Sequence, residues 1–431
     1  PLISTAWLVI EKIISLALSL IITLAIARHL LPESFGKMSY LLALASLVTP
    51  LMAVGLNTIV SREVIKRPND SDKLVGTAIA LRCLASLIIA PMAILWGYLY
   101  LAVDERSLFA FLTLTSVFNA TLVIDFWLQA HVANRFSAMV RLSALLFFSA
   151  ARILAIYIEA ELVTFVLLAG LEVAFVGLLY LLVYHKLSNG ILSLHFSREE
   201  AWKLLRDSRW LLLSGVAAIV YLKIDQVMLG IMIDDQAVGI YAAAARISEV
   251  AYFIPAAIVT SFFPQLVLKR AEDTLAYEGD LQRLNDALFC GAIAIVGGVT
   301  IAAPWMIPML FGEAYAAAVP VLVVHIWAGV FVFMRALLSK WLIAENLLKL
   351  SFLSQLLGAL INVLLNVKLI PLYGPVGAAY ATVASLLVAS YAVLFLHRDL
   401  WPMAWIVTNS IFLPVRLARN GRNLYCKYNR E

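Results

Sequence analysis

The sequence predicts an all-α, polytopic membrane protein with twelve transmembrane helices. Of its 431 residues, 63% are hydrophobic and only 14% are charged, whereas soluble domains carry about 25% charged residues. Apolar runs of about twenty residues or more fill the chain almost from end to end, and a bilayer core of roughly 30 Å needs about 20 apolar helical residues to cross. Because these runs are continuous rather than alternating, they are typical of helices and exclude a transmembrane barrel.

Each predicted helix is an apolar run bounded by polar or turn-forming residues. The first six are expected at residues 2–27, 38–60, 74–101, 108–130, 137–158 and 162–184. The second six are expected at residues 210–233, 239–263, 287–310, 319–338, 350–370 and 376–396. The first run is too long for the core of a signal peptide and lacks a small-residue cleavage signature, so we expect it to be a membrane helix.

The distribution of positive charge predicts the orientation. The chain carries 32 Lys and Arg against 27 Asp and Glu, a net charge of +5. Most of the basic residues fall on one side of the predicted helices, with clusters at 62–73, 198–209 and 416–430. Positive loops stay cytoplasmic, so we expect both termini to be cytoplasmic, and an even number of helices agrees with this orientation.

Two segments outside the predicted spans have interfacial character. Ser197 followed by Glu200 has the spacing of a capping box, and Trp202, Leu204 and Leu205 follow it. This pattern predicts an amphipathic helix on the inner leaflet that joins the two halves. After the last span, residues 401–413 are apolar but too short to span comfortably, and a basic end follows, which predicts an interfacial cytoplasmic tail.

The two halves of the chain are weakly similar at an offset of 203 residues. Trp7 aligns with Trp210, and residues 32–36 align with 235–239, so that two glycines coincide. Each copy then has six helices, and an even number makes the copies point the same way, as in transporters with parallel repeats. We therefore predict two lobes with a cleft between them. The expected parts are an N-lobe (1–185), a linker (186–209), a C-lobe (210–398) and a tail (399–431).

Ionisable residues inside the spans are the candidate site, because they are costly in lipid and usually face a bundle interior or a watery cavity. Basic side chains would give the phosphates of a substrate Coulomb partners, and buried carboxylates are candidates for proton or ion coupling. One alternative stays open: Arg246 with Glu249, and Lys223 with Asp225, are internal pairs that only hold helices together. The candidate substrate-binding cations are Lys12, Arg82, Arg152, Lys223 and Arg246, and the candidate coupling carboxylates are Glu11, Asp225 and Glu249.

Three segments resemble the Wzx-type polysaccharide flippases of the multidrug/oligosaccharidyl-lipid/polysaccharide (MOP) exporter superfamily. Residues 28–36 with Tyr40 are similar to the turn after the first helix of that family. Residues 225–264 contain the most specific match, a D-x-x-x-L-G segment followed by V-G-x-Y-x-x-A-x-R and F-P. Residues 362–382 resemble the family's N-x-x-L-N-x-x-L-I-P-x-Y-G segment and the small residues after it.

The resemblance implies a two-lobe fold like that of MATE transporters. It also implies a particular class of substrate. It implies a flippase of undecaprenyl-pyrophosphate-linked oligosaccharide, an O-antigen or related polysaccharide repeat unit of lipopolysaccharide. The glycan would cross from the cytoplasmic to the periplasmic leaflet of the bacterial inner membrane by alternating access, and proton coupling is a hypothesis. Membrane lipids and other glycan-assembly membrane proteins are the expected partners, and nucleic acid is not.

Other function classes fit the sequence less well. The main alternative is an ion-coupled exporter of drugs or small amphiphiles on the same fold. A membrane glycan polymerase, ligase or glycosyltransferase would need a larger outer loop and a catalytic constellation, and the sequence has neither. A non-transporting scaffold would have no evident need for buried charges on several helices. The three cysteines show no disulfide or metal spacing, so we expect no metal site. We also expect that the protein is not an enzyme and has no cofactor.

Overall fold

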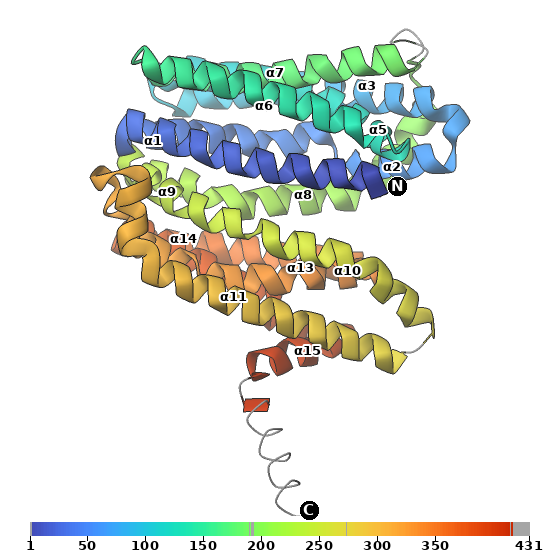
Figure 1. Cartoon of the computed structure of the whole chain (residues 1–431). Helices are drawn as coiled ribbons and strands as arrows, with labels where there is room; N and C mark the ends of the chain where they lie inside the picture. The colour runs from blue at the N-terminus through green and yellow to red at the C-terminus, as the bar shows by residue number, and fades with distance from the viewer. Residues whose placement is uncertain (1, 189, 191–193, 273, 414, 417–431) are drawn as a thin grey trace, which may run out of the picture. The chain divides into compact units, whose positions relative to one another are not determined.

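The structure, a computed structural model, describes residues 2–188, 190, 194–272, 274–413 and 415–416. Almost all of these residues are helical, and no strand occurs among them, in agreement with the predicted all-α class (Figure 1). Short 3-10 helices join several of the α-helices. In chain order the α-helices are α1 (Leu2–Ala53), α2 (Asn57–Lys66), α3 (Ser71–Tyr100), α4 (Val103–Thr115), α5 (Val123–Ala130), α6 (Asn134–Tyr157), α7 (Leu162–Leu187), α8 (Arg198–Met232), α9 (Asp235–Ala251), α10 (Phe253–Glu272), α11 (Thr274–Phe311), α12 (Ala318–His325), α13 (Ala328–Ala344), α14 (Leu348–Ser390) and α15 (Trp401–Ile411).

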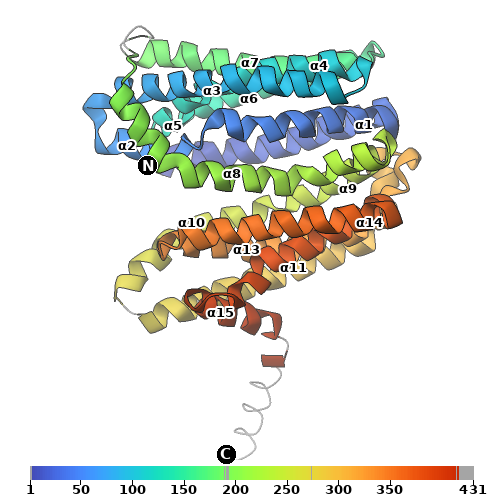
Figure 2. The same cartoon turned by 180° about the vertical axis from the view of Figure 1, so that it is seen from behind.

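Ten helical stretches of the described residues are long and apolar enough to cross a bilayer, and the chain is a multi-pass membrane protein. Two of these stretches, Ile14–Lys66 and Lys349–Phe395, have 53 and 47 residues. A straight helix of that length would extend about 70–80 Å, against a bilayer core of roughly 30 Å. Non-helical backbone interrupts the first at Leu31 (φ 61°) and the second at Gly374 (φ 57°). Both interruptions lie between two predicted spans, and α1 folds back on itself (Figure 2).

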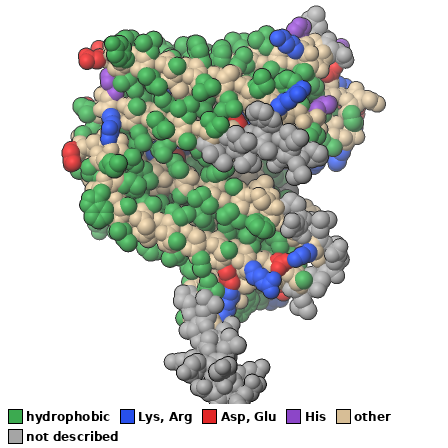
Figure 3. All heavy atoms as spheres, viewed as in Figure 1, with side chains coloured by type: hydrophobic (Ala, Val, Ile, Leu, Met, Phe, Trp, Pro, Cys, Tyr) green, Lys and Arg blue, Asp and Glu red, His purple; other side chains and the backbone are tan. Residues whose placement is uncertain are grey.

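The apolar surface agrees with a lipid environment. Large hydrophobic side chains in the middle of the spans are exposed, such as Leu87, Ile301 and Leu364. On the face drawn in Figure 3, hydrophobic side chains cover much of the surface, and the charged ones gather toward the ends of the helices. Such a band is the surface expected of a protein whose solvent is hydrocarbon.

The first of two compact units comprises Pro1–Ala243 and Leu310–Tyr315. Within it α1 packs against α6 and α8, and α6 packs against α7. One hydrophobic cluster joins α2, α3, α5, α7 and the beginning of α8 through side chains such as Leu74, Ile124 and Leu204. This packing places the start of α8 beside the short helix α2.

The second compact unit comprises Ala244–Met309 and Ala316–Glu431. Within its described part, α13 packs against α10 and α14, and α12 packs against α14. The C-terminal helix α15 lies against α11 (Figures 1 and 2), where Asn285 donates a hydrogen bond of 2.8 Å to the hydroxyl of Ser410.

The predicted linker helix begins where the sequence indicates, but it is not a separate helix. The hydroxyl of Ser197 accepts a hydrogen bond from the backbone N–H of Glu200 at 3.5 Å, so the predicted cap forms. The helix that starts at Arg198 then continues without a break to Met232 as α8. Residues 189 and 191–193 of the predicted linker, and residues 414 and 417–431 of the predicted tail, lie outside the described residues.

Candidate functional site

A buried ionic network joins three helices of the first unit. Arg141 on α6 donates from Nη2 to Oε2 of Glu11 on α1, and from Nη1 to Oδ2 of Asp125 on α5, with both distances 3.1 Å. Glu11 is 5% exposed and Asp125 is 9% exposed. One guanidinium therefore bridges two buried carboxylates that lie far apart in the sequence, and the group carries one net negative charge when all three are ionised.

Asp125 is the more completely satisfied carboxylate of the two. Its Oδ1 accepts from the hydroxyls of Ser137 and, at 3.1 Å, Tyr180. Its Oδ2 accepts from Arg141 and from the amide of Gln129, each at 3.1 Å. A carboxylate offers about four lone-pair sites, so four donors leave Asp125 little capacity for anything else. Its position therefore favours a role in holding the orientation of Arg141.

Glu11 accepts fewer hydrogen bonds than Asp125 does in the described structure. Among the described residues it accepts two hydrogen bonds, one from Arg141 and one of 3.0 Å from the hydroxyl of Ser15. Further polar side chains follow at steps of four along α1, where Thr23 donates to the carbonyl of Ser19 at 2.7 Å. Lys12 lies next along the chain and is exposed. The structure thus places Glu11, but not Lys12, in the buried network.

Arg152 forms a second ion pair within the same unit. Its Nη2 lies 2.6 Å from Oε2 of Glu172, and this contact joins α6 to α7. The side chains are 14% and 24% exposed. A close pair of this kind explains Arg152 as a link between helices. Its predicted contact with substrate stays a prediction, and it requires a phosphate to compete with Glu172.

Arg82 is 1% exposed, and its donors are directed at the protein itself. Nε donates to the carbonyl of Ala53 at 3.1 Å, and Nη1 donates to the carbonyl of Asn119 at 3.2 Å. Nη2 donates to the side-chain oxygen of Asn57. These acceptors lie at the break between α1 and α2 and in the 3-10 segment after α4, where helix carbonyls lose their usual partners. The geometry favours a structural role for Arg82 over the predicted substrate contact.

The remaining candidates lie on α8 and α9. Asp225 is 2% exposed and accepts a hydrogen bond of 2.6 Å from the hydroxyl of Tyr241, which joins the two helices within the first unit. Lys223 is half-buried on α8. Arg246 and Glu249 are also half-buried, on the part of α9 that belongs to the second unit. Their contacts with substrate or with a coupling ion stay predictions.

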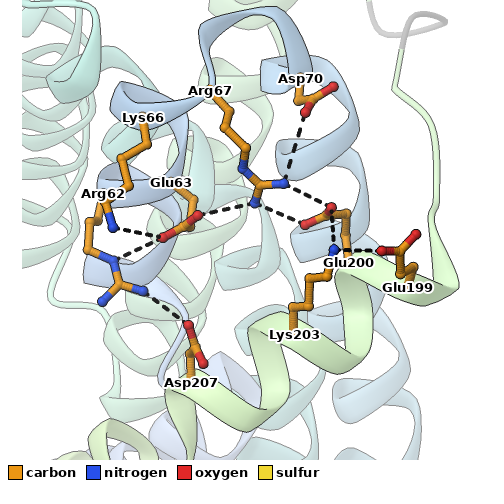
Figure 4. A network of polar contacts seen from close by, with 9 residues as sticks. All are labelled: Arg62, Glu63, Lys66, Arg67, Asp70, Glu199, Glu200, Lys203 and Asp207. Atoms are coloured by element: carbon orange, nitrogen blue, oxygen red, sulfur yellow. Dashed lines mark hydrogen bonds and ion pairs between the residues drawn. The ribbon is translucent and has the colours of Figure 1, made fainter.

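A polar network at one end of the first unit ties α2 to the start of α8 (Figure 4). Arg67 donates to both oxygens of Glu200, at 2.9 and 3.0 Å, and to Glu63 at 3.1 Å. Arg62 donates to Asp207 at 3.1 Å. The hydrogen bonds from Arg67 hold the pKa of the Glu200 carboxyl below its ordinary value. Paired carboxylates neutralise much of the positive charge in this region. The network therefore holds α2 against the start of α8.

Contacts at the helix ends of the first unit explain why Leu310–Tyr315 belongs to it. Nε of Arg28 donates to the carbonyl of Leu310 at 2.8 Å. The hydroxyl of Tyr315 donates to the carbonyl of Ala27, also at 2.8 Å. The carbonyl of Ala27 lies just before the interruption of α1 at Leu31, and that of Leu310 lies in the last turn of α11, two places where the helix no longer supplies backbone donors. These two hydrogen bonds hold residues 310–315, at the end of the ninth predicted span and in the loop after it, against α1.

Sequence reasoning missed Arg141 and Tyr180 and did not include Asp125 among the candidate site residues. Arg141 is not among the candidate residues, although it lies four residues after Ser137, the first residue of a predicted span. That position inside an apolar run is the signal that could have identified it. Tyr180 lies in an uninterrupted apolar run, and nothing in the sequence distinguishes it. Among the described residues, no group of three His, Cys, Asp or Glu is arranged to hold a metal ion.

The chain matches the sequence model of one protein family, and parts of it are similar in sequence to named proteins. The sequence model of a family described as polysaccharide biosynthesis protein matches residues 2–267. A Haloferax volcanii protein named probable flippase AglR is 30% identical over 214 residues, which are 47% of this chain and 44% of that protein. A second H. volcanii protein, named probable low-salt glycan biosynthesis flippase Agl15, is 24% identical over 229 residues, which are 53% of this chain and 47% of that protein. The chain thus matches about half the length of either relative.

The fold is similar to that of a solved transporter. A structure titled lipid II flippase MurJ, inward closed conformation, superposes with a TM-score of 0.70 over 97% of this chain and 93% of that chain. The sequences are 14% identical, so this likeness concerns the fold alone. It agrees with the predicted all-α membrane fold.

Proposed function

We infer the function from one premise: the chain belongs to the polysaccharide biosynthesis protein family. We propose that it is a flippase, which moves a lipid-linked glycan from one leaflet of the membrane to the other without chemical change. The names of its two H. volcanii relatives support this activity, since both are named flippases. The fold that it shares with a lipid II flippase is compatible with it.

The chemistry of the cargo explains why such a protein needs buried charge. A glycan linked to lipid through phosphate carries hydroxyls and negative charge, and hydrocarbon offers neither hydrogen bonds nor counter-ions. A flippase has to supply both while the lipid anchor stays in the bilayer. The observation that carries the proposal is the Glu11–Arg141–Asp125 network, because ionisable residues inside a membrane bundle are retained mainly for function.

Arg141 is the group best placed to receive a phosphate. Asp125 holds one of its nitrogens through a saturated carboxylate, while Glu11 holds the other with fewer supporting donors. A phosphate is a better bidentate partner for a guanidinium than one carboxylate oxygen, so it would displace Glu11. Glu11, once released from Arg141, is the carboxylate that we propose as the coupling group.

Finer features of the proposal extend beyond this network. The interruptions of α1 and α14 support twelve crossings in two six-helix lobes, and the positive loops support cytoplasmic termini. Alternating access between such lobes would carry the glycan past the remaining candidate residues, Lys12, Arg152, Lys223 and Arg246, with Asp225 and Glu249 as further coupling groups. For the carrier we propose undecaprenyl pyrophosphate in the bacterial inner membrane, bearing an O-antigen or related repeat unit. The archaeal origin of the relatives supports the general class, a glycan linked to lipid, rather than that carrier.

Complementation tests the proposal in cells. A strain that lacks the gene should accumulate lipid-linked glycan on the inner face of its membrane and lose the surface glycan, and the wild-type chain should reverse both effects. Arg141→Gln should restore neither, at equal protein level in the membrane. The matched control is Arg135→Gln, an exposed arginine of the same helix, which should complement fully. Full complementation by Arg141→Gln would remove the network from the mechanism, and normal surface glycan in the deletion strain would overturn the activity.

A further inference from the structure

A groove of about 730 Å³ lies between α11 and α15 in the second unit. Helix α11 supplies an acid and an amide to its wall, and α15 supplies two indole rings and a second amide. An arginine from the turn just before α15 completes the polar part of the wall. The polar and aromatic residues that line the groove are Glu278, Gln282, Arg398, Trp401, Trp405 and Asn409, and smaller or aliphatic residues of both helices complete it.

The two helices are held together by a buried hydrogen-bond network, so the groove has fixed walls. The hydroxyl of Ser410 on α15 donates to Asp286 at 2.7 Å and accepts from Asn285 at 2.8 Å and from Gln282 at 3.0 Å. Arg416 also pairs with Asp286. Ser410 and Asn285 are fully buried. Because five residues join α11 to α15 and to Arg416 beyond it, the groove beside them is a built feature of the second unit.

The groove lies among side chains that favour the headgroup level of a bilayer. Trp401 is 49% exposed and Trp405 is 69% exposed. Phe395 and Phe412, on either side of these residues in the chain, are also more than half exposed. Indole rings accumulate where hydrocarbon meets headgroups, because one part of the ring is apolar and the N–H needs a polar partner. The molecules that meet this groove are therefore membrane lipids.

Two side chains of opposite charge, Arg398 and Glu278, line the groove and do not pair with each other in the described structure. Arg398 and Glu278 are both exposed. Within residues 2–188, 190, 194–272, 274–413 and 415–416, neither side chain forms an ion pair with another. A guanidinium is a strong partner for phosphate, and a carboxylate is a strong partner for an ammonium group. The exposed faces of the indoles add an attraction for a cation.

We propose that the α11–α15 groove binds the headgroup of a zwitterionic phospholipid that carries a primary amine. Arg398 receives the phosphate and Glu278 receives the ammonium. The amide nitrogen of Asn409 donates one hydrogen bond to Gln282 at 3.5 Å, and its second N–H is directed to the ester oxygens near the indole rings. The occupied groove anchors the C-terminal helix to the leaflet on the side that carries most of the Lys and Arg residues. This proposal stands apart from glycan transport, and it holds or fails whatever the cargo is.

Lipid retention by the purified full-length protein tests it. The chain, in mild detergent, is mixed with equal amounts of dioleoyl phosphatidylethanolamine, phosphatidylcholine and phosphatidylglycerol, and the bound lipids are counted by native mass spectrometry. We expect the wild type to retain phosphatidylethanolamine several-fold over the other two lipids. Glu278→Gln should abolish the preference over phosphatidylcholine, because it removes the partner of the amine. Arg398→Gln should reduce retention of both zwitterionic lipids.

Matched variants keep the test specific. Arg283→Gln removes an exposed arginine of α11 that does not line the groove, and it should leave the lipid preference unchanged. All three substituted side chains are exposed, so the melting temperature should stay at the wild-type value. Retention of the three lipids in equal amounts, preference for phosphatidylglycerol, or an equal effect of Arg283→Gln and Arg398→Gln would overturn the proposal.

Discussion

Gly36 and Gly239 lie at equivalent positions of the two halves, and the turns that contain them contact each other backbone to backbone. A β-carbon on Gly36 would lie 1.7 Å from the carbonyl oxygen of Asp235, and one on Gly239 would lie 1.9 Å from the carbonyl oxygen of Pro32. Both distances are far inside van der Waals contact. The two segments therefore approach this closely only because neither glycine has a side chain. The contact joins the part of α1 just after its interruption at Leu31 to the start of α9, within the first unit.

Alanine at either glycine should destabilise the first unit strongly. Overpacking a well-packed site usually costs about 1–3 kcal/mol, and here the obstacle is backbone that cannot rotate aside. We expect Gly36→Ala and Gly239→Ala to lower the melting temperature of the purified protein, or to abolish its recovery as a monodisperse species. The control is Gly291→Ala, since a β-carbon at that helical position meets nothing within 4 Å. A wild-type melting curve for Gly36→Ala would contradict the close contact.

Substitutions of Arg141 should lower the stability of the protein, whereas Glu11→Gln should affect the coupling of transport to a pH gradient. Arg141→Gln leaves two buried carboxylates without their cation, a change that typically costs about 3–5 kcal/mol. Arg141→Lys should restore only part of this, because a single ammonium cannot reproduce a planar fork that reaches both acids. Glu11→Gln keeps an oxygen for Arg141, so we expect a folded protein whose transport no longer responds to a pH gradient. Thermal melting and transport with and without the gradient measure both effects. An unchanged gradient response in Glu11→Gln would refute proton exchange at this residue.

Arg82 should behave as a structural residue. Arg82→Gln removes most of three hydrogen bonds to Ala53, Asn119 and Asn57, and hydrogen bonds to charged groups contribute about 1.5–3 kcal/mol each. We expect low yield and a lowered melting temperature. Any protein that still folds should transport in proportion to its amount. A variant that melts like the wild type but fails to transport would instead support the predicted contact between Arg82 and the substrate.

Arg67 and Glu200 should show an energetic coupling in a double-mutant cycle. Contacting residues of one network couple by about 0.5–3 kcal/mol, and Arg67→Ala combined with Glu200→Ala should fall in that range by thermal or denaturant unfolding. The exposed pair Lys203 and Glu199 on α8 serves as the comparison and should show a weaker coupling of about 0.3–0.5 kcal/mol. It is measured with Glu200 unchanged, because Lys203 also lies 3.5 Å from Glu200.

The same pair predicts a pH dependence. Because the folded protein holds the pKa of Glu200 below its ordinary value of 4.5, the coupling should be complete at neutral pH. It should be lost as the pH falls through the lowered pKa, because protonation of the carboxyl removes its charge. Coupling that is equal at neutral and acidic pH would exclude the ion pair.

The fold was largely predictable from the sequence because lipid imposes few solutions. A continuous apolar run has to be a helix, so the spans and most of their boundaries follow from hydropathy. The offset of 203 residues also placed Gly36 on Gly239, which the structure shows in contact. The continuity of α8 was not predictable, since a cap such as Ser197 marks where a helix begins and says nothing of where it ends.

The candidate site was predictable in part. Glu11 was identified because a carboxylate in an apolar run is conspicuous. Its partner Arg141 was missed because an arginine one turn inside a span looks like a loop charge. Arg82 was assigned to the substrate because the sequence shows that a charge is buried but not which atoms face it. Carbonyls released by a break in a helix, as at Ala53, are invisible until the break itself is known.

Translocation in a defined system tests the central claim most directly. The purified protein is reconstituted in vesicles with a fluorescent lipid-linked oligosaccharide in both leaflets, and a membrane-impermeant reagent quenches the outer leaflet. With the wild type, quenching should pass well beyond the outer-leaflet fraction, and Arg141→Gln vesicles should stop at that fraction while Arg135→Gln vesicles match the wild type. Quenching by wild-type vesicles that stops where protein-free vesicles stop would contradict the assignment of this chain as a flippase.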